Sequence, residues 1–218
     1  MKAQLEKLVE ISLQTSLKWL QRSPNGGSRI VDPIDRVPVA SHYGDSHFAA
    51  ATMLLGTMRS DSALVRKAIS VTEAVLDEWH LSSKAKDFHN DFNNFALCLI
   101  DEKVHAISPA LSRRIRRTVL STSDSRHNTI NWLPMRAYVN LAREEWTGDV
   151  KYRAMATRAI AIVAAATNAD GGIEDRLPHG SSYNLQYNVS SHAALDLLKR
   201  RWQETELQLD LGCSRAFL

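Results

Sequence analysis

Apolar residues recur three and four positions apart along almost the whole chain, and this spacing constrains the fold more than any other feature. It is the spacing of one face of an α-helix. Alternating Val-rich stretches, which would indicate β-strands, do not occur. The pattern predicts about eight helices: near 3–22, from 45, from 61, 88–102, from 109, 128–145, 149–167 and 182–202.

The links between these helices indicate how they are arranged. The short links at 59–61 and 147–149 are typical of antiparallel helical hairpins. The longer loops at 23–44, 81–87 and 168–181 would then collect at one end. We therefore expect an all-α fold of antiparallel helical hairpins that form a complete or incomplete α/α toroid. A compact bundle is the plainer alternative. Residues 1–218 are expected to form a single helical domain, with 203–218 as a loose tail.

Composition excludes several classes of protein. The chain has 218 residues, 44% hydrophobic and 23% charged, as in ordinary globular proteins. No run approaches the roughly 18 apolar residues of a membrane span. Glu6 and Glu10 interrupt any signal-peptide core, so we expect a cytoplasmic protein with no membrane partner. Two cysteines make neither a disulfide framework nor a zinc site.

The densest basic run, RRIRR at 113–117, falls on an expected helix. Leu111, Ile115 and Val119 mark the inward face of that helix, so its arginines point to solvent. Because no aromatic residues are interleaved with them, no nucleic-acid partner is expected.

Two polar clusters precede expected helices in the first half of the chain. In SHYGDSHF, Asp45 is expected to cap a helix, and histidines at 42 and 47 match no established metal spacing. If this cluster is functional, His42 and Tyr43 contact substrate. In DFHNDFNNF, the asparagines are costly at a helix start. Either a solvated face or a binding surface that includes His89 and Asn90 explains them.

A third cluster, RHNTINWLPMRAY, opens the expected sixth helix. Asn128, Trp132 and Arg136 are four apart and share one face. An amide, an indole and a guanidinium together suit a sugar ring that carries a carboxylate.

The fourth cluster is DGGIEDRLPHGSSYNLQY, residues 170–187. A turn at the two glycines and a cap at Ser182 account for part of it. They leave seven polar and aromatic side chains unexplained, which predicts one wall of a binding site: Glu174, Asp175, Arg176, His179, Tyr183, Gln186 and Tyr187.

The third and fourth clusters, over about residues 128–200, resemble the toroidal polysaccharide lyases of the alginate-lyase-like group. The counterparts are His127-Asn128-Thr129 before Trp132, then Asp170-Gly171, Glu174, His179-Gly180 and Leu185-Gln186-Tyr187. The resemblance implies β-elimination on a uronate-containing saccharide, without metal or cofactor. It also implies that Asn128 neutralises the carboxylate and that Tyr187 is the acid or base, with His179 and His127 as further catalytic candidates.

The chain departs from this family at several positions. Thr129 stands where the family has its catalytic histidine, so His127, His89 or His42 would have to replace it. Two other functions therefore stay open. One is a cyclase, isomerase or dehydratase of a small metabolite on the same scaffold. The other is a non-catalytic carbohydrate-binding module. Trp202 and the apolar tail leave room for a homodimer contact.

Overall fold

The computed structural model describes residues 2–22, 28–31, 43–81, 89–125, 129–169, 171–177, 180–182 and 185–202. Within these ranges the chain is mostly helical, which confirms the all-α expectation. The chain divides into two compact units, Met1–Ser123 and Asp124–Leu218. No helix in the described ranges is both long and apolar enough to cross a membrane.

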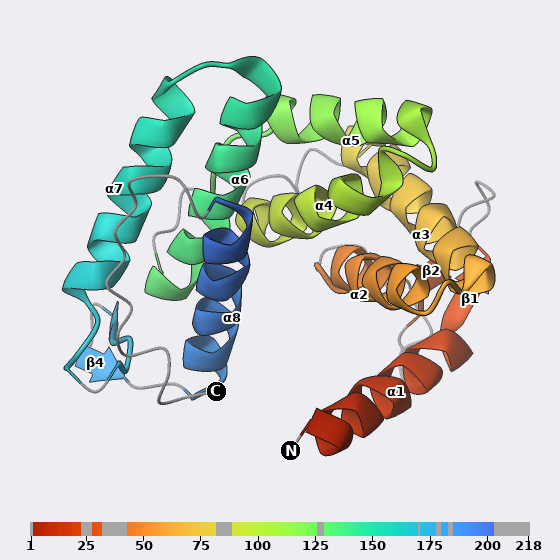
Figure 1. The fold of residues 1–218 in the computed structure, drawn as a ribbon, viewed down its shortest axis with the longest axis horizontal. Coiled ribbons are helices and arrows are strands. Elements are labelled where there is room, and N and C mark those ends of the chain that lie inside the picture. The colour runs from red at the N-terminus through yellow and green to blue at the C-terminus, as the bar shows by residue number, and fades with distance from the viewer. Residues whose placement is uncertain are drawn as a thin grey trace. The chain divides into compact units, whose positions relative to one another are not determined.

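The first unit contains α1 (Lys2–Lys18), β1 (Leu20–Arg22), β2 (Ser28–Ile30), α2 (Gly44–Met58), α3 (Ser62–Leu81), α4 (Asn90–Val104) and α5 (Pro109–Ser121). α2 and α3 form a hairpin, α4 packs beside α2, and α5 packs on α4 and α3 (Figure 1). Near their starts, Tyr43 lies against His89 and Ser46 against Asn93. α2 and α4 therefore run in the same direction and start at one place, as expected for the ends of the loops at 23–44 and 81–87. The third loop of that expectation, 168–181, belongs to the second unit.

Every side chain from Asn90 to Asp101 is buried, so α4 is the central helix of this unit. Phe92, Phe95 and Leu99 are buried as the periodicity predicts. The expectation of a solvated face for the neighbouring asparagines is wrong, because Asn90, Asn93 and Asn94 are buried as well.

Both predicted tight links are helical hairpins. In the link from α2 to α3, Ser60 adopts a left-handed φ of 54°, and Asp61 Oδ1 accepts the backbone N–H groups of Ala63 and Leu64. Asp61 therefore caps α3. At Gly56 the two helices approach closely: a Cβ there would lie 3.0 Å from the backbone nitrogen of Val65.

Leu20 to Arg22 pairs antiparallel with Ser28 to Ile30, although the sequence predicts helix up to residue 22. This hairpin is held by Arg29, which is buried and ion-paired with both Asp45 of α2 (2.9 Å) and Glu78 of α3. Asp45 Oδ1 also accepts the backbone N–H of Ile30 at 2.8 Å. Asp45 thus anchors the hairpin. Its predicted role as helix cap is wrong, because its carboxylate bonds the Arg29 side chain and the backbone N–H of Ile30 in β2.

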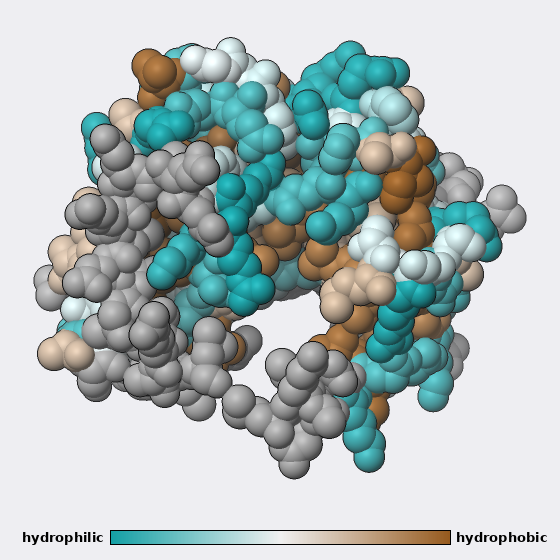
Figure 2. Space-filling view, viewed as in Figure 1, coloured by the Kyte–Doolittle hydropathy of each residue, from teal (hydrophilic) through white to brown (hydrophobic). Residues whose placement is uncertain are grey.

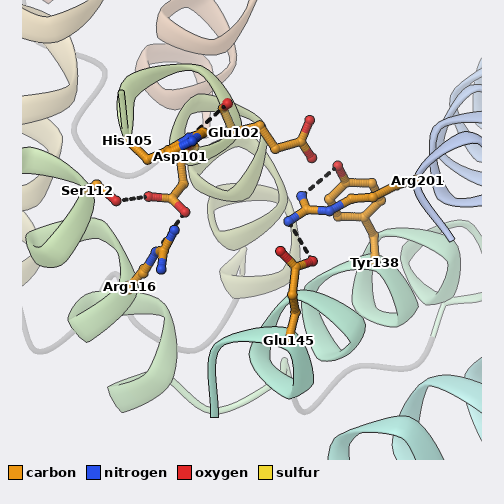
Figure 3. Close-up of polar contacts among 8 residues, drawn as sticks. All are labelled: Asp101, Glu102, His105, Ser112, Arg116, Tyr138, Glu145 and Arg201. Atoms are coloured by element: carbon orange, nitrogen blue, oxygen red, sulfur yellow. Dashed lines mark hydrogen bonds and ion pairs between the residues drawn. The ribbon is translucent and has the colours of Figure 1, made fainter. Parts of the chain in front are cut away.

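On α5, Leu111, Ile115 and Val119 are buried as predicted. Two of its arginines, predicted to face solvent, form ion pairs with neighbouring helices. Arg114 pairs with Asp77 of α3, and Arg116 with the buried Asp101 of α4, which also accepts a hydrogen bond from Ser112 (Figure 3). These side chains connect α5 to its two neighbours.

The second unit contains the 3₁₀ helix η1 (Ile130–Trp132), α6 (Leu133–Thr147), α7 (Lys151–Ala165), β3 (Asp175–Leu177), β4 (Gly180–Ser182) and α8 (Leu185–Arg201). α6 packs on both α7 and α8. Gly148, at φ 72°, ends α6 and opens the hairpin to α7. Arg201 at the end of α8 bonds Glu145 and the Tyr138 hydroxyl of α6 (Figure 3), and Tyr138 packs edge-on against Trp202.

The segment before α8 differs from the prediction in one respect. Asp175 to Leu177 pairs antiparallel with Gly180 to Ser182, so Ser182 belongs to a strand and does not cap α8, which begins at Leu185. The preceding turn is tied to α8: Asn188 exchanges two hydrogen bonds with the backbone of Ile173, and His192 bonds the Gly171 carbonyl at 3.0 Å. Glu174 bonds Asn168 within the turn.

Candidate functional site

The N-terminal ends of α2 and α4 bring together two residues that the sequence predicts as substrate contacts. Tyr43 directly precedes α2 and His89 directly precedes α4. Their ring centroids are 5.1 Å apart. Both side chains are half-buried, so part of each faces solvent. The two helices place a phenol and an imidazole side by side because they start at the same level.

Two further rings complete this cluster, which we call the Tyr43 cluster: Tyr43, His47, His89 and Phe92. Tyr43 stacks on Phe92 at 4.6 Å with an angle of 18° between the ring planes. His47, one turn into α2, lies 4.9 Å from Tyr43. The stack on Phe92 fixes the plane of the Tyr43 ring, which positions its hydroxyl.

Buried asparagines follow His89 in the first turns of α4. Asn93 accepts a hydrogen bond from Ser46 at 2.6 Å, which joins α4 to α2. Asn90, predicted as a substrate contact, donates instead to the Ser123 carbonyl at 2.9 Å, and it is 1% exposed. Asn94 is fully buried, and its amide oxygen and nitrogen have no hydrogen-bond partner among the described residues.

The environment of His47 favours a neutral ring. Burial lowers its pKa below the ordinary value of 6.5, and a hydrogen bond with the Phe92 carbonyl offsets only part of that effect. A neutral imidazole that donates to this carbonyl leaves its other ring nitrogen as an acceptor. His47 thus adds an uncharged polar group to the cluster.

A phenol beside an imidazole is an arrangement that can move protons. Imidazole accepts a proton near neutral pH, and a phenol can donate one to a leaving oxygen. Neither Tyr43 nor His89 caps its helix through its side chain, so capping does not explain the presence of either. Within the described ranges, no group of three or more His, Cys, Asp and Glu side chains is placed to hold a metal ion.

In the second unit, the predicted Trp132 and Arg136 have structural contacts. Trp132 is buried in η1, before α6 begins, so the regular four-residue spacing on which the shared face depends does not hold there. The half-buried Arg136 donates to the Ser125 carbonyl at 2.9 Å. The indole face is therefore not open to a sugar ring, and one nitrogen of the Arg136 guanidinium is already hydrogen-bonded to the protein.

The other predicted site residues are not tested by these contacts. His42, His127, Asn128, His179 and Tyr183 lie outside the described residues. Arg176 lies in β3, and Gln186 and Tyr187 lie in the first turn of α8, by their backbone positions alone.

Sequence reasoning left out His47 and Phe92 as members of the site. Phe92 reads as an ordinary core residue because it continues the apolar stripe of α4. One signal could have identified the cluster: a ring residue stands immediately before each of two helices that follow a long loop. Comparison of the chain with protein-family models, with curated proteins and with solved structures finds no match in any of the three.

Proposed function

We propose that this chain is a carbohydrate-active enzyme that cleaves a uronate-containing saccharide by β-elimination, and that Tyr43 and His89 carry its proton transfers. What supports this is chiefly the 5.1 Å pairing of the two rings at the shared start of α2 and α4. The reaction class comes separately, from the resemblance of residues 128–200 in the second unit to toroidal lyases. The layout of the first unit, in which α2 and α4 run parallel and α3 and α5 pack against them, is compatible with part of an α/α toroid.

In this reaction a base removes the proton on the carbon next to the uronate carboxylate. A double bond forms as the glycosidic C–O bond breaks, and the leaving oxygen takes up a proton. His89 serves as the base and the Tyr43 hydroxyl protonates the leaving oxygen. Proton return from the imidazolium to the phenolate, directly or through water, restores both groups. In this assignment His89 takes the role of the catalytic histidine of the family, at whose position this chain has Thr129.

The uronate carboxylate would meet a favourable field at this place. The N-terminal end of each helix carries partial positive charge, and two such ends meet at the Tyr43 cluster. The carboxylate of Asp45 in the first turn of α2 is already paired with Arg29. Stabilising the carboxylate as its charge grows in the transition state is the contribution expected of such a field.

The test is an ultraviolet assay for unsaturated uronate product with alginate, pectate, glucuronan and glycosaminoglycans. Tyr43→Phe and His89→Gln are each expected to lower the rate by about 10²-fold or more on a substrate that wild type cleaves. Tyr152→Phe in α7 is the matched control and should keep the wild-type rate.

Tyr187→Phe separates two assignments of the site. Loss of activity in Tyr187→Phe, with full activity in Tyr43→Phe, would move the acid to α8 and refute the assignment made above. Absence of product from every substrate would refute the lyase reaction itself. Saccharide binding that persists without turnover would identify a binding module.

A further inference from the structure

An apolar groove of about 540 Å³ lies in the first unit between α1, β2 and α2. Large apolar side chains make most of its wall: Leu8, Leu13, Trp19, Ile30, Phe48 and Leu55. Among the described residues of the wall, the polar side chains are Ser12, Ser16 and His47. Sites that bind small molecules have volumes of about 300–1,000 Å³ and this kind of lining.

Contacts near the two ends of the groove show how α1 and α2 run relative to each other. Glu10 of α1 pairs with Arg59, just after the end of α2, at 2.6 Å. Trp19, just after α1, bonds Val31 after β2 and lines the groove with Gly44 at the start of α2. α1 and α2 are therefore antiparallel. From Gly44 to Leu55 the groove follows about 16 Å of helix, at a rise of about 1.5 Å per residue.

One end of the groove is continuous with the Tyr43 cluster. Gly44 and His47 line the groove, Gly44 follows Tyr43 in the chain, and the His47 ring contacts the Tyr43 ring. The opposite end, at Leu8 and Leu55, is remote from the cluster. The cluster and the groove thus share His47, which lines one end of the groove and contacts the Tyr43 ring.

Part of this apolar wall is exposed. Leu8 is 61% exposed and Trp19 38% exposed, and apolar residues are visible in the α1 and α2 region of Figure 2 among polar ones. Covering them would be favourable in proportion to the apolar area removed from water. The described residues of the wall include no charged side chain, so an apolar group that entered from the cluster end would cover these residues without displacing a charge among them.

We propose that the groove binds the apolar tail of an amphipathic glycoside whose sugar acid lies at Tyr43 and His89. The placement of the sugar acid rests on the proposed function, whereas the binding of the tail depends on the groove alone. The substrate class becomes a 4-O-glycosylated uronate whose anomeric oxygen carries an alkyl or similar elongated apolar group, so that β-elimination breaks the C4–O bond while the tail stays on the sugar acid. Such a ligand matches the polar cluster and the apolar groove in a single molecule.

The experiment compares methyl β-D-glucuronide, octyl β-D-glucuronide and octyl β-D-glucoside, each below its micelle-forming concentration. Binding is followed by calorimetry and by tryptophan fluorescence, with Trp19→Phe used to assign the signal. Octyl glucuronide is expected to bind at least about tenfold more tightly than methyl glucuronide, because the tail leaves water. The fluorescence change should largely vanish in Trp19→Phe.

Two variants block the groove by different means. Ala51→Phe, at an exposed position in the groove wall, fills it, and Leu8→Glu places a charge in it. Each should abolish the advantage of octyl over methyl glucuronide. Ala154→Phe, at an exposed position of α7, is the matched control and should retain it.

Equal affinity for methyl and octyl glucuronide would overturn the inference, even if uronate turnover is found. Tight binding of octyl glucoside equal to that of octyl glucuronide would keep the tail site and remove the sugar-acid specificity on which the proposed function depends. A dimer in sedimentation that Leu8→Glu dissociates would show that a second copy of the chain covers the groove, and would also overturn the inference.

Discussion

At the scale of single residues, the first unit keeps polar groups where an apolar core would be simpler. His47 and Asn94 are the plainest cases. His47 is neutral because burial disfavours its charged form, and Asn94 has no hydrogen-bond partner among the described residues. His47 belongs to the Tyr43 cluster, and Asn94 follows Phe92 of that cluster by two residues on α4. Sites of function are where such departures are expected.

The lowered pKa of His47 predicts a loss of stability in acid. The unfolded chain binds a proton on this ring below about pH 6.5, whereas the folded protein resists protonation until a lower pH. The free energy of unfolding should therefore fall as the pH drops from 6.5 toward the folded pKa. In His47→Gln this component of the fall should be absent, as urea unfolding at several pH values would measure.

His105→Gln provides the comparison for His47→Gln. His105 is exposed at the end of α4, so its replacement should leave the acid-dependent fall in place. The same pH dependence in wild type and His47→Gln would contradict the assignment of that fall to His47.

Asn94 and Asn93 predict opposite responses to the same change. Asn94→Leu should raise the free energy of unfolding by about 1–2 kcal/mol, because a buried amide without partners carries a desolvation cost. Asn93→Leu should lower it by about 1 kcal/mol, because it removes the hydrogen bond from Ser46. Denaturant unfolding of the two variants would measure both; a loss of stability in Asn94→Leu would indicate an ordered water on that amide.

At the scale of elements, the helices could be predicted from the sequence and the strands could not. The helix period and the tight links at 59–61 and 147–149 are local signals, and both are confirmed. The strands have three residues each and no alternating pattern.

Asp45 reads as a cap because its partner, Arg29, is sixteen residues away in a strand that nothing in the sequence predicts. The pairing of Tyr43 with His89 likewise depends on tertiary packing, which spacing cannot reveal.

The β1–β2 hairpin should depend on Arg29. Arg29→Met is expected to cost about 3–5 kcal/mol of unfolding free energy, because Asp45, at 2% exposure, would keep a buried charge without its cation. Arg59→Met, which breaks the exposed pair with Glu10, should cost less than about 1 kcal/mol. Thermal unfolding would compare them, and Arg29→Met combined with Asp45→Asn should recover part of the loss; equal costs would contradict the anchoring role.

At the scale of the whole molecule, the boundary between the two units falls between adjacent residues with separate attachments. The Ser123 carbonyl accepts from Asn90 of the first unit. Asp124 accepts from Asn140 and from the buried Arg143 of the second unit. Each unit therefore holds its own side of the link. This division has no counterpart in the composition of the sequence, where residues 120–126 read as one polar turn.

We predict from these attachments that residues 1–123 fold when expressed alone. The contacts of α2 with α3 and α4, and of α5 with α3 and α4, all lie inside this fragment. Circular dichroism should show a helical fragment with a cooperative thermal transition. A fragment ending at residue 107, which lacks α5, is the control and should lose cooperativity. A non-cooperative transition in the longer fragment would contradict independent folding.

The close approach of α2 and α3 at Gly56 has a consequence for how sequences of this kind diverge. Alanine is one base change away from every glycine codon, so Gly56→Ala must arise often. Its Cβ would press on Val65 of α3, where backbone atoms leave little freedom to move. The Val65 backbone nitrogen and the Leu64 Cβ stay in place whatever side chain stands at 65, so no smaller residue at 65 removes the clash. Position 56 should therefore stay glycine while the exposed positions around it change freely.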